Sequence, residues 1–132
     1  MPTKITLIRV RKNPSQNNIN EELQWFGSSL GLFNLRDKDS SCFRIFITLV
    51  KTTKQDNPLS SDEIAEKLRL SRGTVVHHLT KLIDSGIVVR VRGGYYLREA
   101  RLTNLINDMK RDMDVAFTEL QHVAKEIDEK LG

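Results

Sequence analysis

Apolar residues between positions 59 and 84 recur three and four residues apart, and this spacing predicts two short helices in succession. In the first helix, Ile64, Ala65 and Leu68 form one apolar stripe. Ser60 and Glu63 stand at the spacing of a capping box, which predicts that this helix begins at Ser60.

The second helix is predicted after a tight connection at Arg69 and Leu70, with Ser71 as its N-cap. Its inward face is set by apolar residues at helical spacing, namely Val75, Leu79, Leu82 and Ile83. Gly86 is expected to end the helix in a left-handed conformation.

An alternating, β-branched run follows the second helix. Residues 87–92 are predicted as one strand, and residues 95–97 as the return strand. Gly93 and Gly94 between them suit a two-residue hairpin turn that needs positive φ. Helix, short turn, helix and β-hairpin are the order of a winged helix-turn-helix, so we expect a mainly α fold with a small β-hairpin wing (α+β).

The second helix presents a polar face on the side opposite its apolar residues. A helix that enters the major groove of DNA needs short residues for close approach and longer donors for base edges and phosphates. We therefore predict that helix 71–85 lies in the major groove and wing 87–98 on the DNA backbone. The alternative is a solvated surface helix. The expected DNA-binding residues are Ser71, Arg72, Gly73, Thr74, His77, Thr80, Lys81, Arg90 and Arg92.

The run SRGTVVHHLTKLIDSGIV, residues 71–88, resembles the recognition helix of winged-helix transcriptional regulators of the ArsR and MarR type. The run SSDEIAEKLRLS, residues 60–71, is similar to the helix that precedes it in those families. The resemblance covers about forty residues and implies a DNA-binding regulator. It names neither the operator nor the effector.

From residue 100 onward, apolar residues continue at helical spacing as far as residue 131, with no Gly or Pro between them. They predict one helix of about thirty residues, roughly 45 Å long. A domain of this size cannot cover such a stripe, so we expect a homodimer joined by this helix in a coiled-coil-like pair. The alternative is a helix folded back on its own domain. The predicted dimerisation residues are Leu102, Ile106, Met109, Met113, Ala116, Phe117, Leu120, Val123 and Ile127.

The residues before the helix-turn-helix predict three further elements. Residues 3–12 are β-prone and basic; this strand could contact phosphate, pair at a dimer edge or protect a sheet edge by its charge. Asn20 is expected to cap a short helix that runs through Leu30 and packs its aromatic residues on the domain or a partner chain. A longer helix should start at residue 39 or 40. Cys42 in its first turn is either a buried small residue or a redox-sensitive thiol.

Charge is unevenly distributed along the 132 residues. Residues 1–98 carry 16 Lys and Arg against 9 Asp and Glu, whereas residues 99–132 carry 5 against 8. A basic excess that coincides with the helix-turn-helix and wing favours double-stranded DNA as a partner. The alternative is a merely basic surface.

Composition narrows the class of protein further. The sequence contains neither a long apolar run typical of a membrane span nor a signal-peptide pattern, and its single cysteine fits a reducing compartment, so a cytoplasmic protein is expected.

The sequence offers no catalytic constellation. It has no Gly-rich phosphate loop, no Ser elbow and no His-Glu-x-x-His motif, so we expect a protein that is not an enzyme and needs no cofactor. His77 and His78 are adjacent and point about 100° apart on a helix, so they cannot share a metal. His122 and Glu126 are four residues apart and could hold one only with groups from a second subunit. No metal site is predicted.

These observations predict three regions: residues 1–38 as part of the domain or dimer interface, residues 39–98 as the DNA-binding domain, and residues 99–132 as the dimerisation helix. The expected function is that of a homodimeric, sequence-specific transcriptional regulator. The alternative is a winged-helix module for protein–protein interaction in a transcription or assembly complex, with an incidental basic face.

Overall fold

The computed structural model describes residues 2–9, 18–33 and 40–132 of the chain. The elements follow one another as α1 (Ile19–Ser29), α2 (Ser41–Lys54), α3 (Ser61–Leu68), α4 (Arg72–Asp84), β1 (Val88–Val91), β2 (Gly94–Leu97) and α5 (Leu102–Leu131). The two strands form an antiparallel hairpin in which Val88 pairs with Leu97 and Val91 with Gly94. The fold is a winged helix-turn-helix with a long C-terminal helix, as the sequence predicts.

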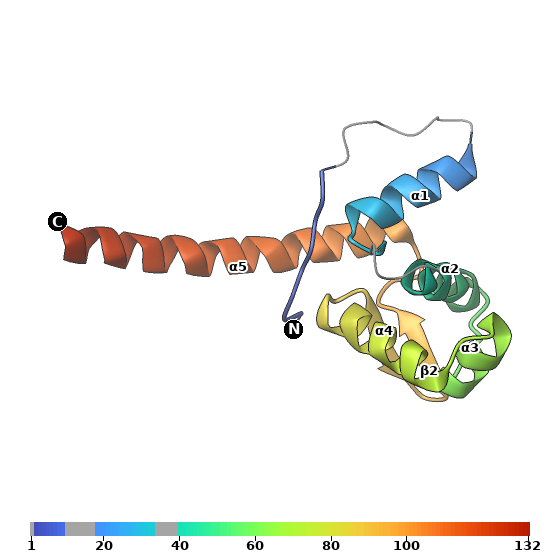
Figure 1. Ribbon diagram of the computed structural model, residues 1–132. Helices are drawn as coiled ribbons and strands as arrows, with labels where there is room; N and C mark the ends of the chain where they lie inside the picture. The colour runs from blue at the N-terminus through green and yellow to red at the C-terminus, as the bar shows by residue number, and fades with distance from the viewer. Residues whose placement is uncertain (1, 10–17, 34–39) are drawn as a thin grey trace.

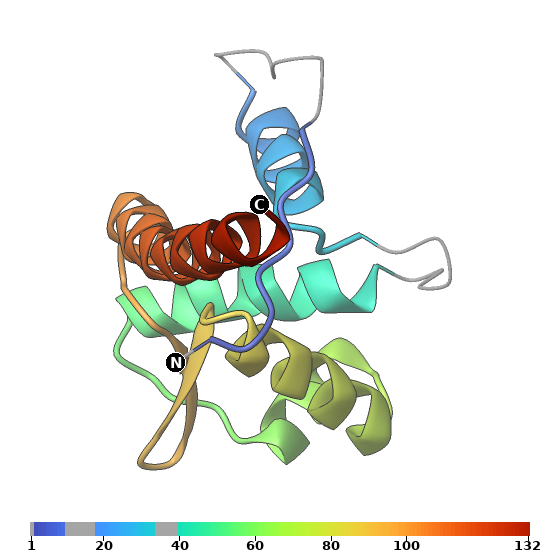
Figure 2. The same ribbon diagram turned by 90° about the vertical axis from the view of Figure 1, so that its left-hand side faces the viewer.

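Helix α2 lies at the centre of the winged domain, with α3, α4 and the hairpin on one side and the start of α5 and α1 on the other (Figures 1 and 2). Its inward residues Ile45, Phe46 and Leu49 are completely buried. They pack with the inward residues of the two motif helices, such as Ile64 and Leu79, in one core. The apolar stripes of three short helices are therefore covered within a single chain.

The predicted ends of the motif helices are confirmed. Ser60 accepts a hydrogen bond from the Glu63 amide and donates its own amide to the Glu63 carboxylate, which completes the capping box of α3. Ser71 caps α4 by accepting from the Thr74 amide at 3.1 Å. Gly86 has a φ of 77°, the left-handed conformation expected just beyond the end of α4.

Helix α1 begins earlier than predicted. The N-cap is Asn18, whose side chain accepts from the amides of Asn20 and Glu21, so Asn20 lies inside the helix. Both residues are Asn, and the sequence pattern alone did not distinguish between them. The ring of Phe26 stacks on Phe46 at 6.1 Å between centroids, so α1 packs on the core of its own domain.

The hairpin turn also differs from the prediction. Because Val91 pairs with Gly94, the two loop residues are Arg92 and Gly93, and only Gly93 has the positive φ, 93°, that the turn requires. Gly94 belongs to β2 and is needed for another reason. A Cβ atom there would lie 2.0 Å from the carbonyl oxygen of Leu59, which accepts a hydrogen bond from Tyr95.

The N-terminal segment, defined here as residues 2–9, does not form the predicted strand; positions 10–12 of that prediction lie outside the described residues. Its backbone bonds to helix ends instead. The amides of Thr3 and Lys4 donate to the Asp84 carbonyl at 2.6 and 3.1 Å, and the amide of Ile8 donates to Ser29 at 2.8 Å. A β-ladder needs a neighbouring strand, and helix ends with unpaired carbonyls are the partners that this fold offers.

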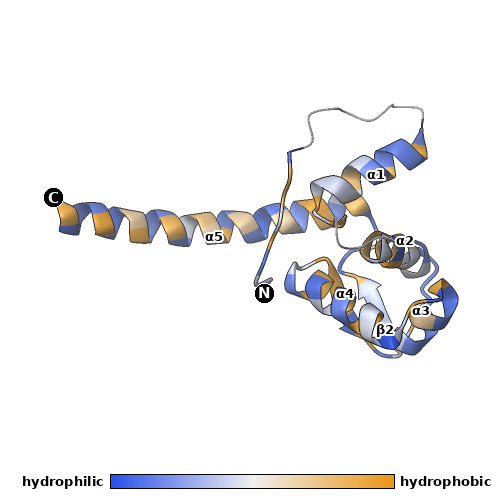
Figure 3. Cartoon of the chain, in the orientation of Figure 1, coloured by the Kyte–Doolittle hydropathy of each residue, from blue (hydrophilic) through white to orange (hydrophobic). Residues whose placement is uncertain are grey.

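Helix α5 has 30 residues, as the sequence predicts, and the burial of its residues differs between its beginning and its end. Leu105 and Met109 are buried in the core of the winged domain. The remainder, residues 114–131, projects away from the domain (Figure 1) and carries hydrophobic residues along its length (Figure 3). We call residues 114–131 the free half of α5. None of the described helices is long and apolar enough to cross a membrane.

Candidate nucleic-acid interface

The first turn of α4 is organised around Ser71. Its hydroxyl accepts from the Thr74 amide and donates to the Thr74 hydroxyl at 2.8 Å. Arg72 follows directly and lies 3.3 Å from the Asp62 carboxylate, with both side chains about 70% exposed (73% and 70%). A surface ion pair of this kind is weak, so the Arg72 guanidinium can exchange Asp62 for another anion at low energetic cost.

The outward face of α4 carries Gly73, His77, Thr80 and Lys81, all exposed. Space around Gly73 is open, since a Cβ atom there would meet no other atom within 4 Å. The Thr80 hydroxyl donates to the Val76 carbonyl at 2.9 Å, and its oxygen can still accept a hydrogen bond. This face therefore combines a glycine, which allows close approach, with imidazole, hydroxyl and ammonium groups. These groups can bond to base edges and phosphates.

Sequence reasoning missed one residue on this face. Val76 is 41% exposed although it follows the fully buried Val75. Two adjacent Val residues in a helix point about 100° apart, so only one can face the core. That geometry was available from the sequence. An exposed β-branched side chain beside His77 offers an apolar contact of the kind that thymine methyl groups make.

Other side chains hold α4 against the domain. Val75, Leu79 and Leu82 have at most 2% of their surface exposed and pack in the core. Arg44 of α2 donates to the Leu68 carbonyl at 2.7 Å and so occupies an otherwise unpaired acceptor at the end of α3. The turn that follows passes through Arg69, a non-glycine residue with φ of 56°. The two motif helices are thus fixed relative to α2.

Two hydrogen bonds tie the wing to the last turn of α2 and to the turn that follows it. The Leu97 amide donates to the Thr53 hydroxyl at 3.0 Å, and the Tyr96 hydroxyl donates to Asp56 at 2.7 Å. Desolvation, together with this bond to Asp56, raises the pKa of Tyr96 to about 12. The shift favours the protonated phenol, which is the form that donates the bond to Asp56.

The two wing arginines predicted to contact DNA are both exposed. Arg90 lies over the ring of Tyr95, with 5.8 Å from its guanidinium carbon to the ring centroid. Arg92 stands at the tip of the hairpin, in the turn with Gly93. A cation stacked on an aromatic ring keeps its charge and gains a preferred direction.

A third wing arginine has a different role. Arg98 makes ion pairs with Asp108 and Asp112 of α5, and the hydrogen bond to Asp112 is the main cause of its raised pKa. Its side chain is 29% exposed. Arg98 therefore connects the end of β2 to α5, and its charge is already balanced by the two carboxylates.

The remaining predicted positions fall into two groups. His122 and Glu126 form an exposed pair at 3.1 Å on α5, and among the described residues no group of three or more His, Cys, Asp or Glu side chains is placed to hold a metal ion. Among the predicted dimerisation residues, Met109 is 3% exposed and belongs to the core of its own domain, whereas Phe117 and Leu120 are more than half exposed at 55% and 64%.

Comparison with known protein families adds one finding. The family model described as "Bacterial regulatory protein, arsR family" matches residues 54–89, from the end of α2 into β1. It contains both motif helices and supports the ArsR side of the resemblance. No curated protein and no solved structure matches the chain. The fold and the matched segment together indicate a DNA-binding transcriptional regulator of the winged helix-turn-helix class.

Proposed function

We propose that the protein is a sequence-specific transcriptional regulator that binds double-stranded DNA as a homodimer. The observation that carries this proposal is the outward face of α4, where Gly73, His77 and Lys81 are exposed on a helix of the arsR-family segment. Helix α4 enters the major groove, and the wing lies on the DNA backbone.

Each side chain of the interface has a separate role in this proposal. His77 contacts a base edge, and Val76 contacts a thymine methyl group beside it. Lys81 lies one turn further along the helix and binds phosphate. Arg72 and the amides at the start of α4 bind a second phosphate, because a helix N-terminus attracts anions. Ser71, Thr74 and Thr80 complete the contacts of α4.

The wing supplies contacts that do not depend on sequence. Arg92 at the tip of the hairpin binds phosphate or enters the minor groove, and Arg90 binds backbone phosphate from its position over Tyr95. Residues 39–98 form the DNA-binding domain in this scheme. Residues 99–132 form the dimerisation helix, and residues 1–38 contribute to the domain and the dimer interface.

A homodimer is supported by the free half of α5. Phe117, Leu120, Val123 and Ile127 have between 49% and 64% of their surface exposed, although they repeat at the three- and four-residue spacing of a helix pair. Two copies joined there present two recognition helices to two half-sites, which is how dimeric helix-turn-helix proteins read DNA with two-fold symmetry.

Electrophoretic mobility shift on genomic DNA fragments at two salt concentrations, followed by sequencing of the retained fragments, tests this function. The proposal predicts that a shared sequence with two-fold symmetry is enriched and that binding weakens steeply with salt. Equal retention of all fragments would contradict sequence-specific regulation. Absence of retention at low salt would favour the protein-interaction module.

A further inference from the structure

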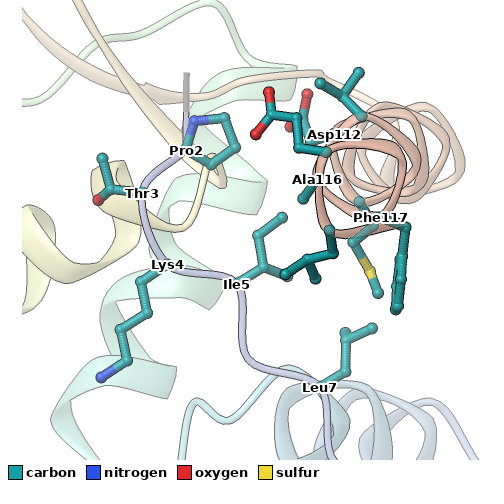
Figure 4. Close-up of a pocket in the computed structure, with 12 residues that line it drawn as sticks. Pro2, Thr3, Lys4, Ile5, Leu7, Asp112, Ala116 and Phe117 are labelled. Carbon is teal, nitrogen blue, oxygen red and sulfur yellow. The ribbon is translucent and has the colours of Figure 1, made fainter. Parts of the chain in front are cut away.

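The N-terminal segment and α5 enclose an apolar groove beside the exposed stripe. The groove has a volume of about 350 Å³ and is lined by Ile5, Leu7, Met113, Ala116, Phe117 and Leu120, among others. Figure 4 shows Ile5 and Leu7 on one side and Ala116 and Phe117 on the other, whereas the Lys4 side chain points away from it. The groove therefore presents mainly apolar side chains.

We propose that this groove is part of the dimer interface, and that the free half of α5 from a second copy of the chain packs into it against Ile5 and Leu7. The inference rests on the proposed homodimer and extends its interface from α5 to the N-terminal segment.

Continuity of the surface supports a second copy as the occupant. Phe117 and Leu120 line the groove and also begin the exposed stripe, which continues through Val123 and Ile127 to Leu131, the last 83% exposed. A stripe with steps of three and four residues is complementary to another helix with the same stripe. The chain itself supplies such a helix, and within the same copy the groove lining ends at Leu120, beyond which every residue of α5 is exposed.

Helix dimensions extend the contact to the N-terminal segment. Packed helices lie about 8–10 Å apart, and a helix with its side chains is about 10–12 Å wide. A helix that covers Phe117 and Leu120 at that distance also covers the adjacent groove, because those two residues form one of its walls. The partner helix then buries Leu7, which is 54% exposed in a single copy.

The N-terminal segment is held firmly enough to serve as a wall. Its two ends are bonded to the Asp84 and Ser29 carbonyls, and Ile5 packs against the hydrophobic core. The bond to Asp84 joins the segment to the last residue of α4. The interface proposed here therefore includes a segment that directly contacts the end of the recognition helix.

Two adjacent aliphatic residues provide a matched test. Leu7 and Ile8 are 54% and 50% exposed, but only Leu7 lines the groove. Leu7→Asp and Ile8→Asp add the same charge at neighbouring positions, and neither removes a backbone hydrogen bond. Sedimentation equilibrium over a range of protein concentrations measures dimer dissociation for both, and circular dichroism with thermal melting verifies that both fold.

The proposal predicts that Leu7→Asp raises the dimer dissociation constant by roughly tenfold or more, since a buried leucine is lost. Ile8→Asp should change it by less than about threefold, the effect of an exposed substitution. Equal dissociation constants for the two variants would overturn the proposal.

The double variant Leu120→Lys with Ile127→Lys separates this failure from that of the homodimer itself. If it is monomeric while Leu7→Asp is unaffected, the dimer stands without the groove; if it dimerises as the wild type does, the proposed homodimer fails.

Discussion

The winged domain and the free half of α5 carry apolar residues at the same helical spacing, but only the winged domain buries them. Leu79 in α4 is 1% exposed and Leu120 in α5 is 64% exposed. Both leucines lie on helices, with apolar neighbours three and four residues away. The two helices differ in what lies opposite them: α4 faces α2 across the domain core, and the free half of α5 extends beyond the domain (Figure 1).

This difference shows what helical periodicity can and cannot establish. An apolar stripe indicates that one face of a helix is covered, because exposed apolar patches of that size mark interaction sites. The stripe does not indicate whether the covering surface belongs to the same chain or to a second copy. Helix α5 shows both outcomes within thirty residues, since Leu105 is completely buried in its own domain and Phe117 is 55% exposed.

The largest effect that separates the two regions is expected from truncating one leucine in each. Leu79→Ala should lower the free energy of unfolding by about 2–5 kcal/mol at every protein concentration, because it leaves a cavity in a closed core. Leu120→Ala should cost within about 0.5 kcal/mol at concentrations where the chain is monomeric. Urea denaturation at several protein concentrations measures both. A loss for Leu120→Ala as large as that for Leu79→Ala, without concentration dependence, would contradict the comparison.

A change of charge on the free half of α5 should abolish dimerisation and leave the winged domain folded. The substitutions Leu120→Lys and Ile127→Lys place two charges within the stripe. Pairing of two α5 helices would bury these charges without partners. We expect monomers by sedimentation velocity, an unchanged helical spectrum and weaker binding to two-fold symmetric DNA. Lys125→Ala, at an exposed polar position of the same helix, is the control and should remain dimeric. A folded double variant with the wild-type sedimentation coefficient would exclude this interface.

Removing one cation from each region should have a smaller effect, which appears in the salt dependence of DNA binding. Arg92→Ala on the wing should weaken binding to most DNA sequences alike and reduce the salt slope by about one unit per lost phosphate contact. Lys125→Ala on the free half of α5 removes the same charge and should leave the slope unchanged. Affinity measured at several salt concentrations gives both slopes. Equal slopes for the two variants would remove the wing from the DNA interface.

The sequence predicted the winged domain well because its signals are local. Ser60 with Glu63, Ser71 and Gly86 act within one or two turns of the chain, and all of them have the predicted conformation. The turn of the hairpin was placed one residue too late, since two consecutive glycines hide which one has the turn conformation. The close approach of the Leu59 carbonyl to Gly94 is a tertiary contact that no local pattern reveals.

The N-terminal segment was mispredicted because its structure depends on partners far along the chain. Its amides bond to Asp84 and Ser29, and β-propensity does not indicate such acceptors. Val76 is a different case, because the polar pattern of the outward face of α4 does not indicate that this face includes an apolar residue next to the buried Val75. The roles of the predicted DNA-binding and dimerisation residues stay predictions, because they depend on a partner molecule that a single chain does not contain.

The proposed function requires the outward face of α4 to read DNA sequence. The most direct test compares His77→Ala with Lys81→Ala on the selected DNA site and on random DNA. His77→Ala should cost roughly 1–3 kcal/mol on the selected site and much less on random DNA, because a base contact is lost only where it is made. Lys81→Ala should weaken both by similar factors, because phosphates are present in every sequence. Both variants should fold, since both side chains are exposed.

The quantity to measure is the ratio of specific to random-DNA affinity for each variant. This ratio should fall about tenfold or more for His77→Ala and stay near the wild-type value for Lys81→Ala. Equal losses on both DNAs for His77→Ala would remove His77 as a reader of bases. Unchanged affinity in both variants would contradict the account and favour the protein-interaction module.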